Sequence, residues 1–370
     1  MRKLSPSEER HPAIVALRRE VEARQNRALT RLRENFGVHI NFVAPVEFEG
    51  GKLWALGDRV YFGRPPNETF HEFLLSILRE TLGERWRAER AAREDKHFLM
   101  RCFEEYREWI RQLSETTEPT DGVWDAPPNG WAQYLRAVAW DVATLVHACP
   151  GGLPDGLVDR MRDPVAFQGA RYELAVAALF ARLDCEIEFL DEVEELRGKS
   201  RPEFIARHRP TEQRIAVEAK SRHRAGVLNE EGEPNEGDPL SGDARAVRAL
   251  FVKALKKDIG GLPYLIFIDI NAPADRERDG FDKEWAQDVR RWMARFDKPT
   301  AQNPDGYNGL FVTNFAPHYQ GDDLASPGEW FCALPIYTVA PLGLDFLGMV
   351  GYALDRYDRV PEIGLDGEVR

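Results

Sequence analysis

Cysteine is scarce in this sequence of 370 residues, and long hydrophobic runs are missing from it. Its four cysteines lie far apart, and none belongs to a CxxC or Cys/His spacing: Cys102, Cys149, Cys185 and Cys332. We therefore expect reduced thiols, a cytoplasmic location and no structural zinc. The most apolar segments, such as LPYLIFIDI, have the length of a strand, and the charged start MRKLSPSEERHP shows no secretory signal. The sequence predicts no membrane association.

Two common catalytic motifs are also missing. There is no GxxxxGK[ST] loop, so the sequence does not predict a nucleotide-driven motor. The segment FHEF is half of a zinc-protease HExxH motif, but position 75 is leucine. Charged residues make up 30% of the chain and the net charge is −12. That balance argues against a protein that coats DNA non-specifically, although it is compatible with a local basic surface.

What is present divides the chain into two parts at residues 116–130, which concentrate Thr, Pro, Gly and Asp. We expect residues 1–120 to form a mostly helical N-terminal domain with a small β region in VHINFVAP and KLWALGDRVYFGR. Residues 131–370 should form a second domain with a core at about 163–271. The expected order there is helix, three strands, helix, strand, which predicts a mixed α/β fold whose β-sheet is flanked by helices.

The strand RIAVEAK carries two opposite charges on one face. Side chains alternate along a strand, so Glu218 and Lys220 share one face while Ile215 and Val217 share the other. The preceding strand, RPEFIARHR, begins next to Glu203. If the two strands form a hairpin, Glu203 lies beside Glu218, and the pair of carboxylates meets the lysine.

A third acid lies on the preceding helix. Ala166, Ala170, Glu173 and Ala177 follow helical spacing, so Glu173 interrupts an otherwise small and apolar stripe. Three carboxylates gathered at one point would repel one another without a divalent cation, and such oxygen-rich sites suit Mg²⁺ or Mn²⁺. An ion of this kind polarises a phosphoryl oxygen and activates a bound water, and Lys220 could stabilise the charge that builds on the phosphate. These are the requirements of phosphodiester hydrolysis.

With Glu173 on a small-residue helix, then PEF, then VEAK, the segment at about 163–271 resembles the PD-(D/E)XK nuclease superfamily, whose fold is restriction-endonuclease-like. The resemblance implies a Mg²⁺-dependent nuclease. It implies that Glu203 and Glu218 bind the metal, that the Ala219 carbonyl is a further ligand and that Lys220 is catalytic. It also implies that Glu173 acts on the metal directly or through water. The family usually has aspartate at the position of Glu203, and the extra methylene would shift the metal or lower activity.

Several interpretations remain open. Ser221 and Arg222 follow the motif lysine and are candidates for substrate contact, whereas most other basic residues nearby are typical of a solvated helix face. The leading hypothesis is a nuclease that cuts DNA rather than RNA, and the resemblance is compatible with a setting in defence against foreign DNA or in a mobile element. One alternative is an inactive nuclease-fold protein that binds nucleic acid or protein; another is an RNA nuclease or a DNA-repair exonuclease. The N-terminal part would serve target recognition, homodimer formation or docking of a protein partner.

Overall fold

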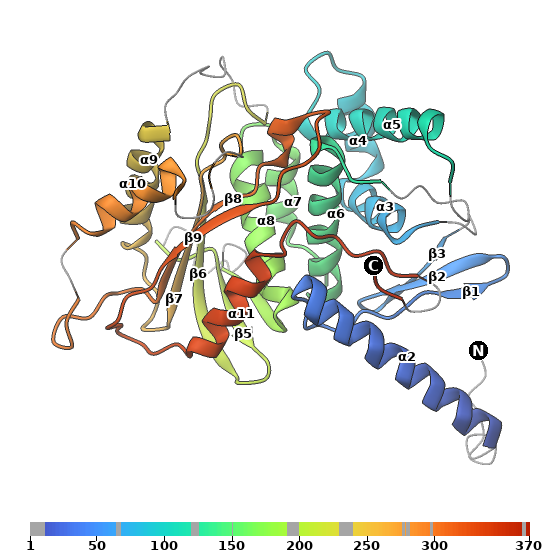
Figure 1. Ribbon diagram of the computed structural model, residues 1–370, viewed down its shortest axis with the longest axis horizontal. Coiled ribbons are helices and arrows are strands. Elements are labelled where there is room, and N and C mark those ends of the chain that lie inside the picture. The colour runs from blue at the N-terminus through green and yellow to red at the C-terminus, as the bar shows by residue number, and fades with distance from the viewer. Residues whose placement is uncertain are drawn as a thin grey trace.

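The computed structural model describes residues 12–63, 68–119, 126–149, 151–190, 200–228, 240–275, 278, 282–296, 299–364 and 368–370. Within these ranges the protein has a six-stranded mixed sheet, a three-stranded antiparallel sheet and ten α-helices (Figure 1). The predicted mixed α/β class is confirmed at this level. None of the described helices is both long and apolar enough to span a membrane.

The N-terminal region is mostly helical, as predicted. Its elements are α2 (Pro12–Phe36), β1 (Val46–Phe48), β2 (Gly51–Leu56), β3 (Arg59–Gly63), α3 (Phe70–Leu82), α4 (Glu84–Ala91) and α5 (Phe98–Thr116). Helix α3 begins with a capping box, in which Thr69 and Glu72 satisfy each other's backbone N–H groups. The strand predicted in VHINFVAP is wrong over its whole length, because residues 38–45 have no ladder partner and pairing starts at Val46.

The remaining elements are α6 (Gly130–Ala148), α7 (Asp155–Arg162), α8 (Phe167–Arg182), β4 (Cys185–Phe189), β5 (Phe204–His208), β6 (Gln213–Ser221), α9 (Leu240–Ala254), β7 (Tyr264–Asp269), α10 (Glu284–Met293), β8 (Gly309–Asn314), a 3₁₀ turn η3 (Pro317–Gln320), β9 (Glu329–Ala333) and α11 (Leu344–Leu354). The strands lie in the order β4-β5-β6-β7-β8-β9. The first three are antiparallel neighbours, β6, β7 and β8 are parallel, and β9 returns antiparallel. The predicted order of helix, three strands, helix and strand is confirmed.

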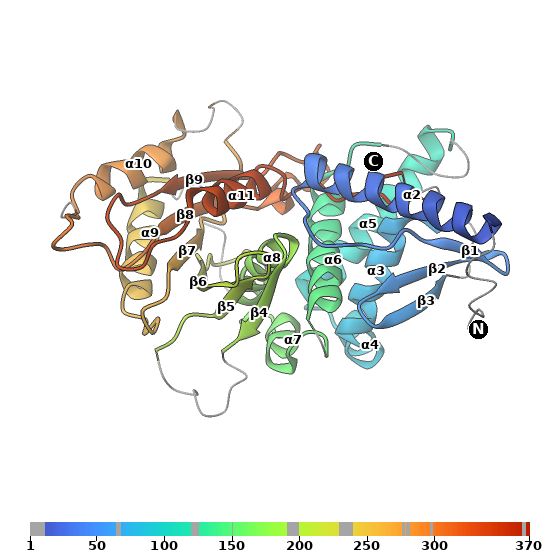
Figure 2. The same cartoon turned by 90° about the horizontal axis from the view of Figure 1, so that it is seen from below.

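Helices cover both faces of this sheet. Helix α8 lies on one face, between the sheet and α6, while α9 and α10 lie on the other (Figures 1 and 2). The alternation along β6 follows this division: Val217 and Ala219 belong to the apolar cluster that includes α8, and Ala216 belongs to the cluster that includes α9 and α10. A side chain on β6 therefore faces either α8 or α9, according to its position.

Helix α6 lies at the centre of the fold and packs against α3, α5 and α8. Sixteen of its residues are buried, which is typical of a helix enclosed on all sides. It carries Asp141, whose carboxylate accepts a hydrogen bond from Arg182 of α8 at 2.6 Å and another from the Tyr357 hydroxyl at 2.5 Å. Both charged side chains are at most 5% exposed. One apolar cluster runs from α3 through α6 to α8 and the sheet, so the two parts of the chain share a core.

We expect the Asp141–Arg182 pair to be essential for stability. Replacing Asp141 with alanine leaves the Arg182 guanidinium buried without its counter-ion, and the expected loss in the free energy of unfolding is about 3–5 kcal/mol. Urea unfolding at 25 °C measures this loss. Glu186→Ala is the matched control, because Glu186 pairs with Arg207 at the surface and should cost less than about 1 kcal/mol. Equal losses in the two variants would contradict the prediction.

Histidine burial makes the fold sensitive to acid. His97 has no exposed surface, and its Nδ1 accepts the Leu99 N–H at the start of α5 at 3.2 Å. Burial, helped by the charge of Arg90, lowers the pKa of His97 to about 4. The folded protein therefore favours the neutral imidazole more than the unfolded chain does. This contribution to stability is complete above the ordinary histidine pKa near 6.5 and is lost as the pH falls toward 4.

We predict that His97→Asn makes stability less dependent on pH. Asparagine keeps a side-chain acceptor for capping α5 but has no proton to gain between pH 7 and pH 4.5. The free energy of unfolding of the parent protein should fall by about 2 kcal/mol more than that of the variant over this interval. Chemical denaturation at the two pH values measures the difference, and parallel decreases would exclude His97 as a source of acid sensitivity.

Candidate active site

Glu203 and Glu218 meet at the side chain of Lys220. Strand β5 begins at Phe204 opposite Val217, and the Glu203 N–H donates to the Val217 carbonyl at 3.1 Å. This hairpin brings Glu203 to the end of β6 that carries Glu218 and Lys220. The Lys220 Nζ contacts Oε1 of Glu203 and lies 2.8 Å from Oε1 of Glu218. The predicted proximity of these three side chains is therefore present in the structure.

The site is largely closed to solvent. The Glu218 side chain has no exposed surface, and those of Glu203 and Lys220 are 13% and 19% exposed. Burial raises the pKa of Glu218, and the charge of Lys220 opposes that rise. For Lys220, burial alone would lower the pKa, but the Glu203 and Glu218 carboxylates outweigh it and raise the pKa above its ordinary value. The lysine is therefore a stable cation between two acids.

The oxygen atoms at this point fit a hard divalent ion. Oε2 of Glu218 is buried and has no hydrogen-bond partner among the described residues. The Val217 carbonyl faces β5, and by the alternation of the ladder the Ala219 carbonyl faces the same side, past the first residue of β5. Two carboxylates and one backbone carbonyl are donors that Mg²⁺ accepts, with water completing its shell. Glu203, Glu218 and Ala219 are thus the residues that would hold it.

Glu173 does not join this group. Its helix, α8, packs on the sheet face of Val217 and Ala219, whereas Glu218 and Lys220 point to the opposite face. The Glu173 carboxylate is instead held by Arg160 of α7, through two contacts of 2.7 and 3.0 Å. The described residues contain no group of three or more acids, histidines or cysteines placed to hold a metal. The expected convergence of three carboxylates is therefore not found.

Ser221 also faces away from Lys220. It is 7% exposed, and its hydroxyl donates to the Asp269 carboxylate at 3.2 Å on the α8 side of the sheet. Arg222 is anchored by its backbone, since its N–H donates to the Asp269 carbonyl at 2.9 Å. A substrate bound beside Lys220 would not reach the Ser221 hydroxyl, so the expected contact from Ser221 is not supported. The role of Arg222 stays a prediction.

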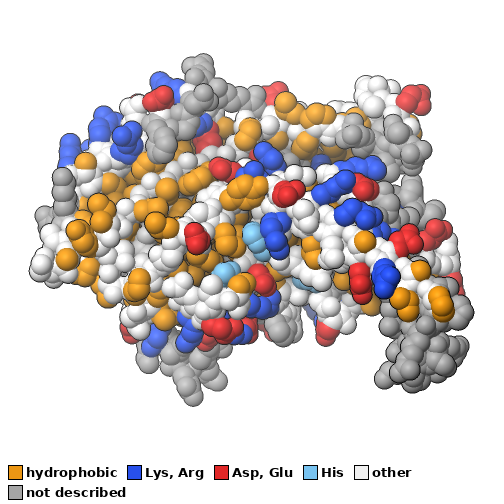
Figure 3. Space-filling model, turned by 60° about the horizontal axis from the view of Figure 1, so that its bottom comes forward, with side chains coloured by type: hydrophobic (Ala, Val, Ile, Leu, Met, Phe, Trp, Pro, Cys, Tyr) orange, Lys and Arg blue, Asp and Glu red, His pale blue; other side chains and the backbone are white. Residues whose placement is uncertain are grey.

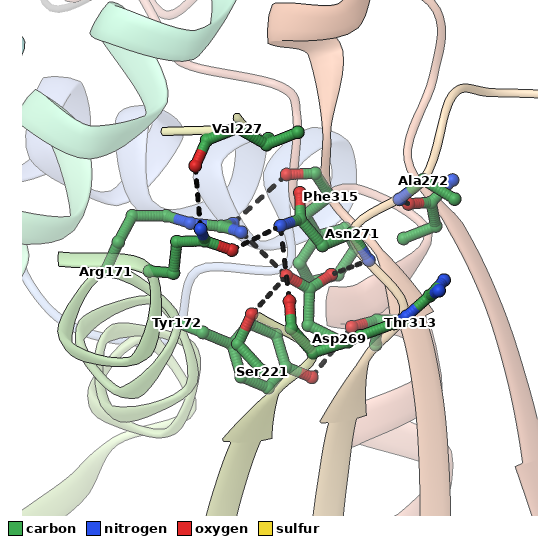
Figure 4. A network of polar contacts seen from close by, with 12 residues as sticks. Arg171, Tyr172, Ser221, Val227, Asp269, Asn271, Ala272, Thr313 and Phe315 are labelled. Atoms are coloured by element: carbon green, nitrogen blue, oxygen red, sulfur yellow. Dashed lines mark hydrogen bonds and ion pairs between the residues drawn. The ribbon is translucent and has the colours of Figure 1, made fainter. Parts of the chain in front are cut away.

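The partner of Ser221 belongs to a buried polar network at the carboxyl ends of β6, β7 and β8 (Figure 4). Asp269 binds Arg171 of α8 at 2.6 Å, and Arg171 also donates to the Phe315 carbonyl at 3.1 Å. The Asn271 side chain donates to Gln168 of α8 at 2.9 Å. This network fixes the segment after β6 against α8 and so holds the end of the strand that carries Lys220. The signal for it was present in LIFIDINA, where Asp269 and Asn271 follow an apolar strand.

A second lysine reaches the site from a distant part of the sequence. Lys257 lies three residues after α9, and its Nζ is 3.2 Å from Oε1 of Glu218. Its side chain is 15% exposed. In the sequence, Lys257 belongs to a run of basic residues typical of a solvated helix face, so its contact with Glu218 was not predicted.

Comparison with known proteins adds no relative. No family model matches the chain, and neither the curated proteins nor the solved structures contain a match.

Proposed function

We propose that the protein is a metal-dependent nuclease that hydrolyses phosphodiester bonds of nucleic acid. The observation that carries the proposal is the meeting of Glu203 and Glu218 at Lys220, on a hairpin whose buried Glu218 oxygen is without a hydrogen-bond donor in the described chain. The order α8, β4, β5, β6, α9, β7 supports it, because Glu218 and Lys220 lie on β6 and Glu203 lies immediately before β5, as the resemblance to PD-(D/E)XK nucleases implies.

In the proposed mechanism, Glu203, Glu218 and the Ala219 carbonyl would hold a Mg²⁺ or Mn²⁺ ion. The bound ion would supply Lewis acidity and a more acidic water. Lys220 is kept protonated by its two acidic neighbours, so it acts as a hydrogen-bond donor and positive charge rather than as a base. Its ammonium group would lie beside the phosphate and stabilise the negative charge that develops as the phosphorus–oxygen bond breaks. The enclosed position of Glu218 strengthens these electrostatic interactions.

Basic side chains near the site favour a polyanionic substrate despite the net charge of −12. Arg248 and Lys253 of α9 are exposed, on the helix that leads to Lys257. On the neighbouring helix α10, Arg290 and Arg291 are exposed, and Arg291 also pairs with Asp288. Figure 3 shows basic side chains at this end of the molecule and others over the middle of the same face. Such groups neutralise backbone phosphates without reading sequence. We propose DNA as the substrate before RNA, and defence against foreign DNA as the setting.

The rival function is a nuclease-fold protein that binds nucleic acid or protein without cutting it. Glutamate in place of the usual aspartate at position 203 favours this rival. The Lys220 contact with Glu203 also favours it, because an ammonium ion already neutralises the carboxylate that a metal would need. The two functions differ in whether the site cleaves the nucleic acid that it binds.

Nuclease assays test the proposal directly. Purified protein is incubated with supercoiled, linear and single-stranded DNA and with RNA, in Mg²⁺, in Mn²⁺ and in EDTA. We expect metal-dependent cleavage of DNA, and we expect Lys220→Met and Glu218→Gln each to lower kcat at least about 100-fold by removing charge at the reacting phosphate. Cleavage of RNA alone would redirect the proposal to an RNA nuclease.

Matched surface substitutions control for non-specific effects. Lys256→Met and Glu188→Gln change the same residue types at exposed positions, and both should cleave like the parent protein. Cleavage that survives both Lys220→Met and Glu218→Gln would show that the reaction takes place elsewhere. Tight nucleic-acid binding with no cleavage in either metal would establish the rival function.

We further propose that the N-terminal region forms a homodimer through the outer face of its three-stranded sheet. The register places Val46, Phe48, Val60 and Phe62 on one face, with exposed fractions of 46%, 47%, 69% and 50%. The other face packs Trp54 on α3. The register sets these four side chains on one face together with Leu53 and Ala55, so they form a contiguous apolar surface rather than isolated exposed residues. Two copies meeting face to face would remove these side chains from water.

Sedimentation equilibrium tests the dimer. The parent protein should sediment as a dimer, and Val60→Lys should convert it to a monomer because the new charge would be buried in the interface. Val165→Lys is the matched control, since Val165 is 62% exposed outside this sheet, and it should remain dimeric. A monomeric parent protein, or a Val60→Lys variant that stays dimeric, would refute the proposed interface.

A further inference from the structure

Lys257 joins β6 to the segment that leads into β5, and these two segments carry the proposed metal ligands. Besides its contact with Oε1 of Glu218 at 3.2 Å, its Nζ donates to the Arg201 carbonyl at 2.6 Å. Arg201 precedes Glu203 by two residues. The neighbouring Asp258 N–H donates to the Ser200 carbonyl at 2.7 Å, so the end of α9 is fixed to the segment that leads into β5. Lys257 is therefore held in place from two sides and is not a freely moving surface lysine.

The two lysines leave one oxygen of Glu218 available. Lys220 and Lys257 both lie against Oε1, at 2.8 and 3.2 Å. Oε2 is buried and has no hydrogen-bond partner in the part of the chain that the structure describes. A metal ion that used this carboxylate would bind at Oε2, with Lys257 remaining at Oε1.

Charge within the cluster sets a limit on how many divalent ions it accepts. Glu203 and Glu218 contribute two negative charges, and Lys220 and Lys257 contribute two positive charges, so the four side chains sum to zero. Two-metal nucleolytic sites place their ions about 3.5–4 Å apart and share carboxylates between them. A second ion at that spacing would meet the fixed ammonium group of Lys257, which already contacts Oε1 of Glu218 and the Arg201 carbonyl oxygen, two oxygens that such an ion would use.

The geometry points to Lys257 as a charge-compensating residue that takes the place of a second divalent ion, so that the site binds one metal ion. This inference rests on the proposed nuclease site and specifies its metal stoichiometry. Lys257 acts through Glu218 and the neighbouring backbone, so it is a positioning residue. Lys220 keeps its separate place between the two carboxylates.

The experiment is Mn²⁺ binding to the full-length protein, followed by isothermal calorimetry and by the electron paramagnetic resonance signal of free Mn²⁺. The parent protein should bind one Mn²⁺ per chain. Lys257→Met keeps the apolar stem but removes the charge, so the stoichiometry should rise toward two. Lys257→Arg restores the charge and should return it to one. Lys256→Met, a substitution at the exposed neighbouring residue, should leave it at one.

The outcomes separate this inference from the nuclease proposal. One Mn²⁺ in the parent and also in folded Lys257→Met, with unchanged affinity, would refute the role of Lys257 while leaving the nuclease site intact. Two Mn²⁺ ions in the parent would refute the inference as well. No Mn²⁺ binding in the parent would overturn both proposals. Thermal unfolding of each variant without metal establishes that it is folded, and a lysine that served stability alone would lower the unfolding temperature without changing the stoichiometry.

Discussion

The Glu218 carboxylate has no exposed surface, so its negative charge has to be compensated by the residues around it. Taking such a charge out of water is costly unless opposite charges and hydrogen bonds replace the lost hydration. Two ammonium groups compensate the charge: that of Lys220 on the same strand and that of Lys257, which follows α9. Strand β6 lies inside the sheet between β5 and β7, so water has little access from the sides. The two lysines that neutralise Glu218 therefore also set the charge of the proposed metal site.

Ion pairs on the other face of the sheet hold helices and strands together. Helix α8 carries Arg171 and Arg182, each at most 5% exposed and each bound to one buried aspartate. Arg171 fixes the carboxyl ends of the parallel strands through Asp269, while Arg182 fixes α6 through Asp141. These pairs connect elements that are distant in sequence, and each arginine has a buried aspartate as its counter-ion. Burial of charge alone therefore does not mark a reactive site. The proposed site rests instead on the meeting of Glu203 and Glu218 at Lys220 and on Oε2 of Glu218, which has no hydrogen-bond partner among the described residues.

Local patterns in the sequence predicted much of the hairpin that carries the proposed site. Strand alternation placed Glu218 and Lys220 on one face, and the short connection between the strands brought Glu203 to them. The same alternation places Ser221 on the face opposite Lys220, so the expected substrate contact neglected a signal that was available. For Glu173, helical spacing indicated a stripe that faces the sheet but not which side of the sheet the helix covers.

Contacts between remote segments escaped prediction for a physical reason. The position of Lys257 depends on how far α9 runs and where it meets residues 200 and 201, and neither is encoded in a local repeat. The extended segment at 38–45 shows the converse. Its alternating Val38, Ile40 and Phe42 are all buried, which is the pattern of a strand, yet they pack against helices and have no ladder partner. The alternating pattern of this segment predicted its burial correctly, but the strand pairing that it also predicted is absent at residues 38–45.

Because α6 is enclosed on every side, the helical region and the sheet region are not interchangeable modules. Helix α3 packs on one side of α6 and α8 on the other, within one continuous apolar cluster. A recombination event that replaced residues 1–120 with an unrelated segment would leave one side of α6 facing water. Substitutions in residues 1–120 are therefore tolerated only where they keep the apolar surface that packs against α6.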